Sequence, residues 1–554
     1  MNMSKRDHTR REFLVQSSIV AAGAFAAPQM LSQSVGELPA RLRGLMVDAA
    51  RVPESLIYYR RVIDFCADWQ LNALQFRLAD DQGCALRFSS VPDLYFHPHA
   101  FAPEQLHDLA RYANARGVDL IPELESFGHT GYITRSAAYK HLLDADPEQS
   151  AEFTGVIPVH PETLHLFGKL YREVAEVFPS IYLHGGCDEV NWGGSTLSRE
   201  ALASKQRFEV WVEYLNALDQ VADSVGKQFV VWGDMVVRKE PKILERLNKR
   251  IIVMDWDYTE TNSARLRETR AQIGSAGHRA IGAPALISYR VGPRAGPSQL
   301  ANIDAFADAY AGDKGGTKDG TLGVILTNWI PSRYIQNSIW DGFAYTAVAF
   351  AEGSKAARKS AFQRFVQKHY GSKWNEDWAE VFRVIYQNAP QVHEADAGAE
   401  TVPLRVPWSN DEQLSSAREI SASTSNPFAP LQASLGRLRK LVSKNAADFT
   451  AFTLCVSYLE HTFWRDSVVS NLQLTHDQTT PAIRDIAKRD CALAEALSED
   501  WDQGRFSDSK QNPLFGFEPK DQLYFQFQRA ADYSVSLASH PDRFLKILLA
   551  SRHA

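Results

Sequence analysis

Eight apolar, strand-like runs alternate with amphipathic stretches between residues 42 and 351, and this alternation most constrains the fold. The predicted strands are residues 42–47, 72–78, 118–125, a run that starts at 181, 228–232, 250–256, 279–286 and 322–329. The predicted helices are residues 53–69, 103–116, 161–178, 199–225, 241–248, 263–275, 298–311 and 339–351. Strands and helices that alternate over about 310 residues indicate parallel strands joined by crossover helices.

We therefore predict an α/β fold in the form of a closed (β/α)8 TIM barrel. An open, doubly wound sheet is the alternative, but it rarely needs eight regular units. An open sheet of this type would also require a Gly-rich phosphate-binding turn after the first strand. The sequence has neither a G-x-G-x-x-G at that place nor a P-loop.

The alternation stops near residue 355, and long amphipathic stretches follow a helix predicted at residues 356–370. These stretches are residues 430–444, 449–472, 481–501 and 519–537, after a polar, Pro-containing linker at 390–412. Helix-period patterns of this kind indicate an all-helical C-terminal domain, as in a bundle. We predict a catalytic barrel over residues 37–375 and the helical domain over residues 376–554.

The first residues have the pattern of an export signal. Thr9-Arg10-Arg11-Glu12-Phe13-Leu14 is a twin-arginine pattern, and a mildly apolar stretch with an A-x-A-like cleavage site follows it. That stretch is shorter than the roughly 20 apolar residues that a membrane span needs. We predict a signal peptide and linker over residues 1–36, and a periplasmic or secreted protein exported by the twin-arginine route.

Composition excludes several classes of protein. A chain of 554 residues is too long for one ordinary domain, and 45% hydrophobic with 23% charged residues is typical of a globular protein. The net charge is −6 and no run of Lys or Arg forms a stripe, so nucleic acid is not an expected partner. Five widely spaced cysteines without C-x-x-C indicate neither a disulfide framework nor a zinc site. No metal or organic cofactor is implied, and the oligomeric state is left open.

Two adjacent carboxylates, Asp188 and Glu189, follow the fourth predicted strand. Such a pair is a candidate for acid/base chemistry, although an acidic turn that caps the next helix has the same pattern. The other strand ends carry Asp48, Arg51, Asp80, Glu123, Glu125, His129, Trp232, Asp234, Trp256, Asp257 and Trp329. A TIM barrel gathers its strand ends at one face, so these side chains predict a common site. Carboxylates together with several Trp side chains suggest a carbohydrate ligand.

Four of these segments resemble the successive motifs of glycoside hydrolase family 20, the β-N-acetylhexosaminidases. They are RGLMVDAAR at 43–51, LNALQFRLADDQG at 71–83, IPELESFGHT at 121–130 and HGGCDEV at 184–190. The resemblance covers residues 41–190 well and is weaker to about 355. The α/β domain that usually precedes the family's barrel has no room here, so the chain is similar to the short members that begin with the barrel.

The resemblance implies an exo-acting hydrolase that releases terminal GlcNAc or GalNAc by substrate-assisted, retaining catalysis. In that scheme the substrate's 2-acetamido oxygen attacks the anomeric carbon. Glu189 would be the general acid and then the general base, and Asp188 would orient the acetamido group. The remaining implied substrate-binding residues are Arg51 at the sugar hydroxyls, Asp80 and His129 behind Glu189, and Trp232, Trp256, Trp329 and Tyr289 around the acetamido group.

Three positions depart from the family pattern. Cys187 replaces the second Gly of the family's Gly-Gly-Asp-Glu. Tyr289 is displaced from the place of the family's acetamido-binding Tyr. Pro331 stands where the family's Trp-x-Glu has its Glu, so one sugar-binding carboxylate is missing. These changes predict altered sugar specificity rather than loss of catalysis.

Two alternatives stay open from the sequence. One is a glycosidase of the same fold that accepts another sugar. The other is a carbohydrate-binding protein without turnover. Asp188, Glu189, Asp80 and His129 are all retained, which favours an enzyme, because a general acid acts in the transition state and a binder has no need of one.

Overall fold

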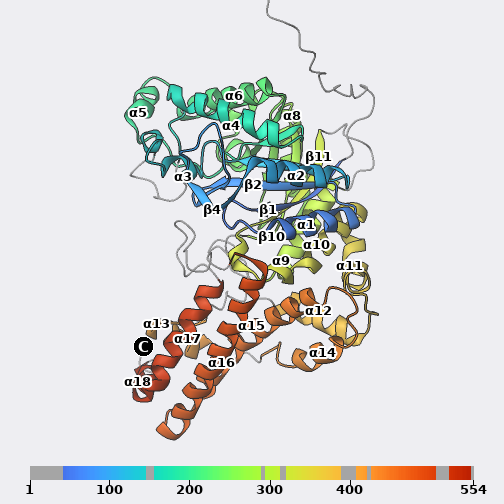
Figure 1. Ribbon diagram of the computed structural model, residues 1–554, viewed down its shortest axis with the longest axis vertical. Helices are drawn as coiled ribbons and strands as arrows, with labels where there is room; N and C mark the ends of the chain where they lie inside the picture. Colours follow the sequence, from blue (N-terminus) through green and yellow to red (C-terminus); the bar gives the residue numbers. More distant parts are fainter. Residues whose placement is uncertain are drawn as a thin grey trace, which may run out of the picture. The chain divides into compact units, whose positions relative to one another are not determined.

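The computed structural model describes residues 41–144, 155–288, 293–311, 320–388, 407–420, 426–506 and 523–550. The predicted signal segment, residues 1–36, lies outside these ranges, as does Tyr289. Figure 1 shows the arrangement of helices and strands along the chain.

Eight parallel strands close into a barrel. Each strand pairs with two neighbours in the order β1-β11-β9-β8-β7-β6-β5-β2, and the pairing of β1 with β2 closes the ring. The strands are β1 (Leu42–Asp48), β2 (Ala73–Asp80), β5 (Asp119–Leu124), β6 (Tyr182–His184), β7 (Gln228–Trp232), β8 (Ile252–Trp256), β9 (Arg279–Ala283) and β11 (Thr321–Asn328). The predicted TIM barrel is confirmed.

Helices lie between successive barrel strands, as the alternation predicted. They are α1 (Leu56–Asp68), α2 (Pro103–Asn114), α3 (Gly131–Thr134), α4 (Pro161–Val177), α5 (Thr196–Leu202), α6 (Arg207–Ser224), α7 (Pro241–Arg246), α8 (Ser263–Ser275), α9 (Pro297–Phe306) and, after β11, α10 (Trp340–Glu352). Two predicted elements are each divided in two. The helix predicted at 199–225 is α5 and α6, and the strand predicted at 279–286 is β9 and β10 (Ala285–Ile287), which are separated at Pro284, a residue without a backbone N–H.

An excursion between β2 and α2 was not predicted. It forms β3 (Gly83–Leu86), antiparallel to β2, and β4 (Phe96–Phe101), which pairs with β3. Its sequence, with several Ser, Pro and His residues, lacks the apolar run that indicates a buried strand.

The barrel has two apolar layers. Side chains that alternate along the strands fill the interior, and their neighbours pack outward against the helices. The interior layer includes Met46, Ile121, Val230 and Ile325, and its upper end is formed by Trp232 and Trp329. Aromatic residues therefore close the core at the end where the strands' polar residues begin.

After α10 the described residues form helices. They are α11 (Ser354–His369), α12 (Glu376–Asn388), α13 (Asp411–Ile420), α14 (Leu431–Leu438), α15 (Ala446–Asn471), α16 (His476–Gly504), α17 (Leu523–Ser539) and α18 (Pro541–Ala550). The predicted helical C-terminal region is confirmed, whereas its division from the barrel at residue 375 stays a prediction. The start predicted at Pro481 was wrong, because α16 begins at His476 and accepts Pro481 in its second turn.

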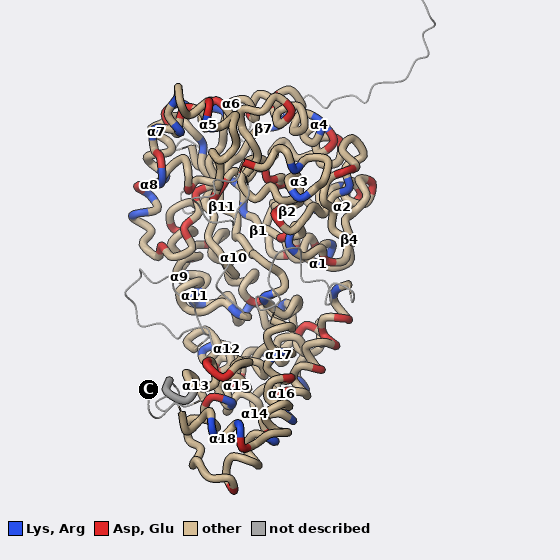
Figure 2. The backbone as a smooth tube through the Cα atoms, turned by 90° about the vertical axis from the view of Figure 1, so that its left-hand side faces the viewer, with Lys and Arg blue, Asp and Glu red and all other residues tan. Residues whose placement is uncertain are grey.

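Figure 2 shows acidic and basic residues interspersed over the helices. No helix among the described residues is long and apolar enough to cross a membrane. All five cysteines are unpaired thiols, four buried and one, Cys491, exposed.

Candidate active site

The two adjacent carboxylates lie on a sharply turning segment after β6. Gly186, Cys187 and Glu189 all have positive φ, at 65°, 71° and 44°. No residue other than glycine fits at position 186, because a Cβ there would lie 1.8 Å from Glu125 Oε2. The same Glu125 oxygen accepts the backbone N–H of Cys187 at 3.0 Å. The turn thereby fixes the direction in which Asp188 and Glu189 leave the barrel.

His129 connects both carboxylates to the end of β2. Its Nε2 lies 3.4 Å from Glu189 Oε2 and 3.9 Å from Asp188 Oδ2. Its Nδ1 lies 3.2 Å from Asp81 Oδ2 and 3.5 Å from Asp80 Oδ1. His129 also has a positive φ of 50°, which aims the ring into this position. The predicted link from Asp80 through His129 to Glu189 is therefore present as a chain of contacts.

Two buried arginines hold the acidic side chains behind His129. Arg51 Nη2 lies 3.0 Å from Asp80 Oδ2, and Arg51 Nη1 donates to Asp48 Oδ2 at 3.0 Å. Arg77 Nε donates to the same Asp80 oxygen at 3.1 Å. Arg77 Nη1 also pairs with Glu125 Oε1 at 2.8 Å, and with Glu123. A planar guanidinium with several N–H donors suits such multiple carboxylate contacts.

The site has more carboxylates than cations. Eight acidic side chains face four cationic ones, Arg51, Arg77, His129 and Lys239. The acidic side chains are Asp48, Asp80, Asp81, Glu123, Glu125, Asp188, Glu189 and Asp234. An excess of buried negative charge raises the pKa of some of these groups, so the cluster retains protons near neutral pH.

Some groups of this cluster have raised pKa values and others have lowered ones. Burial disfavours the charged forms of Asp80 and His129. At Asp80 the charges of Arg51, Arg77 and His129 outweigh burial and hold the pKa well below the ordinary range. At His129 the charges of Asp80 and Asp188 outweigh burial and hold the pKa well above it. Burial and then the charge of Asp188 raise the pKa of Glu125 well above its usual range. The same two causes raise the pKa of Asp234 to about 7.

The pKa values of Asp188 and Glu189 shift in opposite directions. Burial raises the pKa of Asp188 in spite of His129 and Arg77. Burial also acts on Glu189, but the hydrogen bond and charge of His129 outweigh it and lower the pKa of Glu189. Adjacent carboxylates with opposite shifts are the pattern of an acid/base pair. Asp188 Oδ1 is buried and has no hydrogen-bond partner among the described residues.

The predicted Trp residues meet beside the carboxylates. The rings of Trp232 and Trp329 lie 5.7 Å apart between centroids, and the guanidinium of Arg51 lies 5.3 Å from the Trp329 ring. Trp256 joins this group through Tyr258, whose ring is 4.9 Å away and whose hydroxyl accepts the Trp329 indole N–H at 2.9 Å. The described site residues therefore belong to one connected group, except Asp257. The Asp257 side chain accepts hydrogen bonds from Thr259 and from the Glu260 backbone N–H instead.

The Cys187 side chain lacks the features of a reactive thiol. Its side chain is buried, and burial, then Glu125, raises the pKa of the thiol well above its ordinary value. The Sγ lies 3.2 Å from the Gly185 carbonyl oxygen. A thiol without thiolate character is neither a nucleophile nor a metal ligand.

Two groups of side chains in the cluster have the donor types of a metal site. His129, Asp188 and Glu189 each place a donor atom within 4.8 Å of the others, and so do His129, Asp80 and Asp81. His129 is common to both sets. The charges of Asp80 and Asp188 outweigh burial and raise the pKa of the His129 ring, which favours the protonated form that donates to these carboxylates. The arrangement is suited to holding and moving a proton.

Sequence reasoning missed three residues of the site. Arg77 lies in β2 and Tyr258 follows β8, each beside predicted residues. The third, Arg505, follows α16 and donates to the Pro331 carbonyl oxygen at 2.6 Å, next to Trp329. Position along a barrel strand could have indicated the first two, whereas nothing in the local sequence indicates Arg505. Asp234, which was predicted, accepts the Glu189 backbone N–H at 3.4 Å.

Comparison with known families gives one match in this region. The model described as "Glycosyl hydrolase family 20, catalytic domain" matches residues 41–298. This range includes every described site residue except Trp329 and Arg505.

Among curated proteins, the chain is similar to β-hexosaminidase subunit beta of Felis catus, at 28% identity over 210 residues, which are 35% of this chain and 39% of that protein. It is also similar to the β-hexosaminidase of Akkermansia muciniphila, at 30% identity over 183 residues, 29% of this chain and 37% of that protein. The chain thus spans well under half the length of these curated relatives.

Among solved structures, a family 20 exo-β-N-acetylglucosaminidase from Vibrio harveyi matches 58% of this chain and 56% of its own, with a TM-score of 0.46 and 20% identity. A chitobiase from Flavobacterium johnsoniae matches 89% of this chain and 78% of its own, with a TM-score of 0.49 and 16% identity.

Proposed function

We propose that the chain, whose residues 41–298 match the catalytic domain of glycoside hydrolase family 20, is an exo-acting β-N-acetylhexosaminidase that works by substrate-assisted, retaining catalysis. The substrate class is a glycan with a terminal β-linked N-acetylhexosamine. The names of the relatives support that class, and the site supports the mechanism.

The observation that carries the mechanism is the side-by-side placement of Asp188 and Glu189. Both contact the same nitrogen of His129, and an oxygen of each lies within 4.8 Å of the other. A two-carboxylate retaining enzyme places its pair on opposite sides of the scissile bond, about 5–5.5 Å apart. Two carboxylates that leave one turn side by side favour a nucleophile supplied by the substrate.

In the proposed reaction Glu189 protonates the leaving oxygen while the 2-acetamido oxygen attacks the anomeric carbon. The unpartnered Asp188 Oδ1 accepts the acetamido N–H and stabilises the positive charge that develops on that group. Glu189 then takes a proton from the water that opens the oxazolinium intermediate. Approach of the substrate displaces water around Glu189, whose side chain is 37% exposed, and this desolvation raises its pKa toward that of an acid.

The test is hydrolysis of p-nitrophenyl β-GlcNAc and β-GalNAc, and of a β-linked disaccharide of GlcNAc, by wild type and Glu189→Gln. We expect Glu189→Gln to lose about 100-fold or more on the disaccharide. The loss should be smaller with p-nitrophenol, a good leaving group that needs less protonation. Equal losses on both substrates, or none, would contradict the assignment of Glu189.

A thiazoline analogue of the oxazolinium intermediate separates the mechanisms. Wild type should bind it far more tightly than substrate, and Asp188→Asn should lose most of this advantage. If wild type hydrolyses a glycoside but the thiazoline inhibits no better than the sugar product, the chain is a glycosidase of another mechanism.

We also propose export by the twin-arginine route, on the pattern at residues 9–14. Expression in a Gram-negative host followed by cell fractionation tests it. The wild-type chain should be recovered outside the cytoplasm, and Arg10→Lys combined with Arg11→Lys should retain it inside. Equal distribution of the two chains would contradict the proposal.

A further inference from the structure

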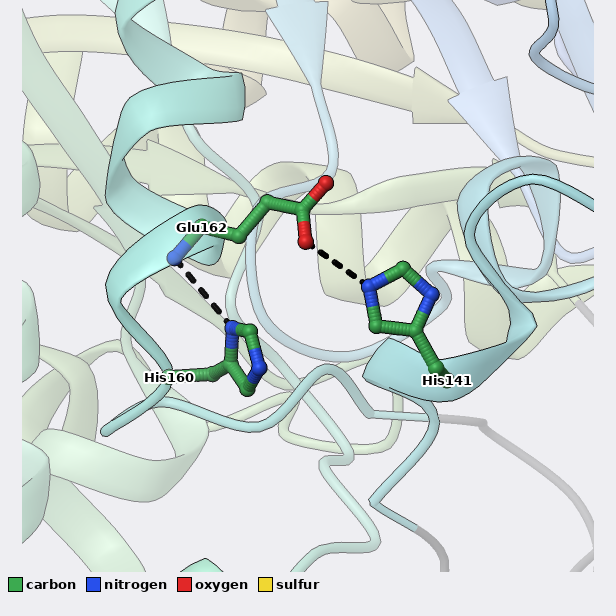
Figure 3. Close-up of side chains that lie close together, drawn as sticks. All are labelled: His141, His160 and Glu162. Atoms are coloured by element: carbon green, nitrogen blue, oxygen red, sulfur yellow. Dashed lines mark hydrogen bonds and ion pairs between the residues drawn. The ribbon is translucent and has the colours of Figure 1, made fainter.

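Three metal-ligating side chains outside the candidate active site converge on the segment that joins β5 to α4. His141 lies in the short helix η1 (Lys140–Leu142), His160 immediately precedes α4, and Glu162 lies in its first turn. One donor atom of each side chain lies within 4.8 Å of the other two. Figure 3 shows the Glu162 carboxylate directed toward the His141 ring, with the His160 ring against the start of α4.

The backbone holds these side chains together independently of any contact between them. Leu143 and Val156 form an antiparallel bridge, and the Ile157 N–H donates to the Leu142 carbonyl oxygen at 2.9 Å. The Thr163 hydroxyl donates to the Ile157 carbonyl oxygen at 2.8 Å. Leu142, Val156 and Thr163 are buried, so the scaffold belongs to the packed part of the chain.

The side chains themselves remain accessible. His141 Nε2 lies 2.8 Å from Glu162 Oε2, and the two side chains are 48% and 41% exposed. His160 Nδ1 accepts the Glu162 backbone N–H at 3.2 Å. An ion can therefore reach the cluster from solvent, and water can complete its coordination.

We propose that His141, His160 and Glu162 bind a divalent transition-metal ion, with zinc as the first choice. Two imidazoles and one carboxylate, with water in the remaining position, form a ligand set that zinc takes readily. Magnesium and calcium prefer oxygen ligands and are not expected to compete.

The present geometry needs little change to close on zinc. Ligands of a tetrahedral zinc ion at about 2.0–2.1 Å are about 3.4 Å apart. The donor atoms here lie within 4.8 Å of one another and the His141–Glu162 pair lies at 2.8 Å, so changes of about 1.4 Å at most bring each pair to this spacing. Rotation of the half-exposed side chains supplies this movement. His141 has to carry its proton on Nδ1, and His160 exchanges its long hydrogen bond to the helix for the ion.

The expected consequence is a more stable β5–α4 segment. This segment also carries His129, and Asp144 in it accepts the Ser195 backbone N–H at 2.7 Å, which ties it to the chain that follows Glu189. Zinc that binds the folded protein in preference to the unfolded chain raises the melting temperature in a concentration-dependent way. Binding and stability are thus measurable without reference to hydrolysis.

The experiment is zinc titration of the full chain after dialysis against EDTA, by calorimetry and by metal analysis. We expect one ion per chain with a micromolar Kd, unchanged by millimolar magnesium. His141→Ala should weaken binding at least tenfold. His160→Asn removes the imidazole but retains a good helix N-cap, so it should weaken binding similarly without lowering the melting temperature of the metal-free protein.

His165→Ala is the matched control, because His165 is exposed on the same helix α4 but lies outside the cluster. It should bind zinc like wild type. Cobalt supplies a second readout, since coordination by imidazole produces visible absorption bands that both cluster variants should lose. Failure of wild type to bind zinc tighter than about 1 mM, or full binding by His141→Ala, would overturn the proposal and leave an ordinary surface hydrogen bond.

Discussion

Arg505 Nε lies 2.9 Å from Glu54 Oε1, and this buried ion pair joins residues 451 positions apart. The pair connects the end of α16 with the segment that follows β1. Gln336 donates to the other carboxylate oxygen at 2.6 Å, and Arg505 also donates to Pro331. The helical C-terminal region thus supports the segment after β11, which follows directly on Trp329 of the candidate site.

Arg505→Ala should be strongly destabilising, because it leaves the buried Glu54 without its cation. Breaking such a pair costs about 3–5 kcal/mol of the free energy of unfolding. Urea denaturation measures this cost. In the folded fraction, KM should rise more than kcat falls, because Arg505 contacts the segment that follows Trp329, a proposed sugar-binding residue, and not the groups around Glu189.

The control for Arg505 is Arg364→Ala, which breaks an exposed ion pair with Glu352. Its cost should stay below about 1 kcal/mol. If the two variants are equally stable, the buried pair has no special role in the fold.

Gly186→Ala should abolish activity. A Cβ at this position meets the Glu125 carboxylate at 1.8 Å, so the turn that carries Asp188 and Glu189 has to move. Gly226→Ala is a matched control, because Gly226 also has a positive φ, 75°, but a Cβ there meets nothing within 4 Å. Both variants acquire a similar backbone strain of roughly 1 kcal/mol, and only Gly186→Ala should lose turnover. Equal activity of the two would show that the turn tolerates displacement.

Replacing Cys187 tests whether its thiol or its backbone conformation matters. Cys187→Gly relieves a φ of 71° and removes the thiol, whereas Cys187→Ala removes the thiol and retains the strain. We expect both variants to keep activity within a few fold, with Gly the more stable by up to about 1 kcal/mol. Thermal denaturation compares their stabilities. Loss of activity in Cys187→Ala would assign the thiol a role in the reaction.

Asp234 should make stability depend on pH. Burial and Asp188 hold the pKa of its folded form at about 7, above the ordinary 3.8. Between these values the folded protein holds a proton that the unfolded chain has released, so the free energy of unfolding falls as pH rises from about 4 to 7. Asp234→Asn should flatten this fall by up to about 1.4 kcal/mol per pH unit.

The measurement for Asp234 is urea denaturation of wild type and Asp234→Asn at pH 5 and pH 8. The fall in stability between the two pH values should be smaller in the variant. Parallel changes in both proteins would contradict a raised pKa at Asp234.

The repeating part of the fold could be predicted from sequence because each strand and helix has its own local pattern. Pro284, which divides a predicted strand, and the β3–β4 excursion were missed, since neither has the period of a regular element. The residues of the candidate site likewise divide into those that local position predicts and those that it does not. Residues at strand ends, such as Asp80 and Trp232, could be placed together by the barrel geometry alone.

What could not be predicted depends on distant contacts. Arg505 enters the site through tertiary packing of a helix whose own sequence is ordinary. The opposite pKa shifts of Asp188 and Glu189 depend on the burial of each group and on its distance to His129, which adjacent positions in the sequence do not reveal. The cluster of His141, His160 and Glu162 likewise depends on the bridge between Leu143 and Val156.

The closure of the barrel by β1 and β11 has a consequence for synthesis on the ribosome. Leu42, near the start of the described chain, pairs with Gly323, so the ring cannot form until most of the barrel has emerged. Until then β1 and the last completed strand both present unpaired edges, which are prone to association with other chains. Stalled or shortened nascent chains that end before β11 should therefore be a main source of aggregation during expression.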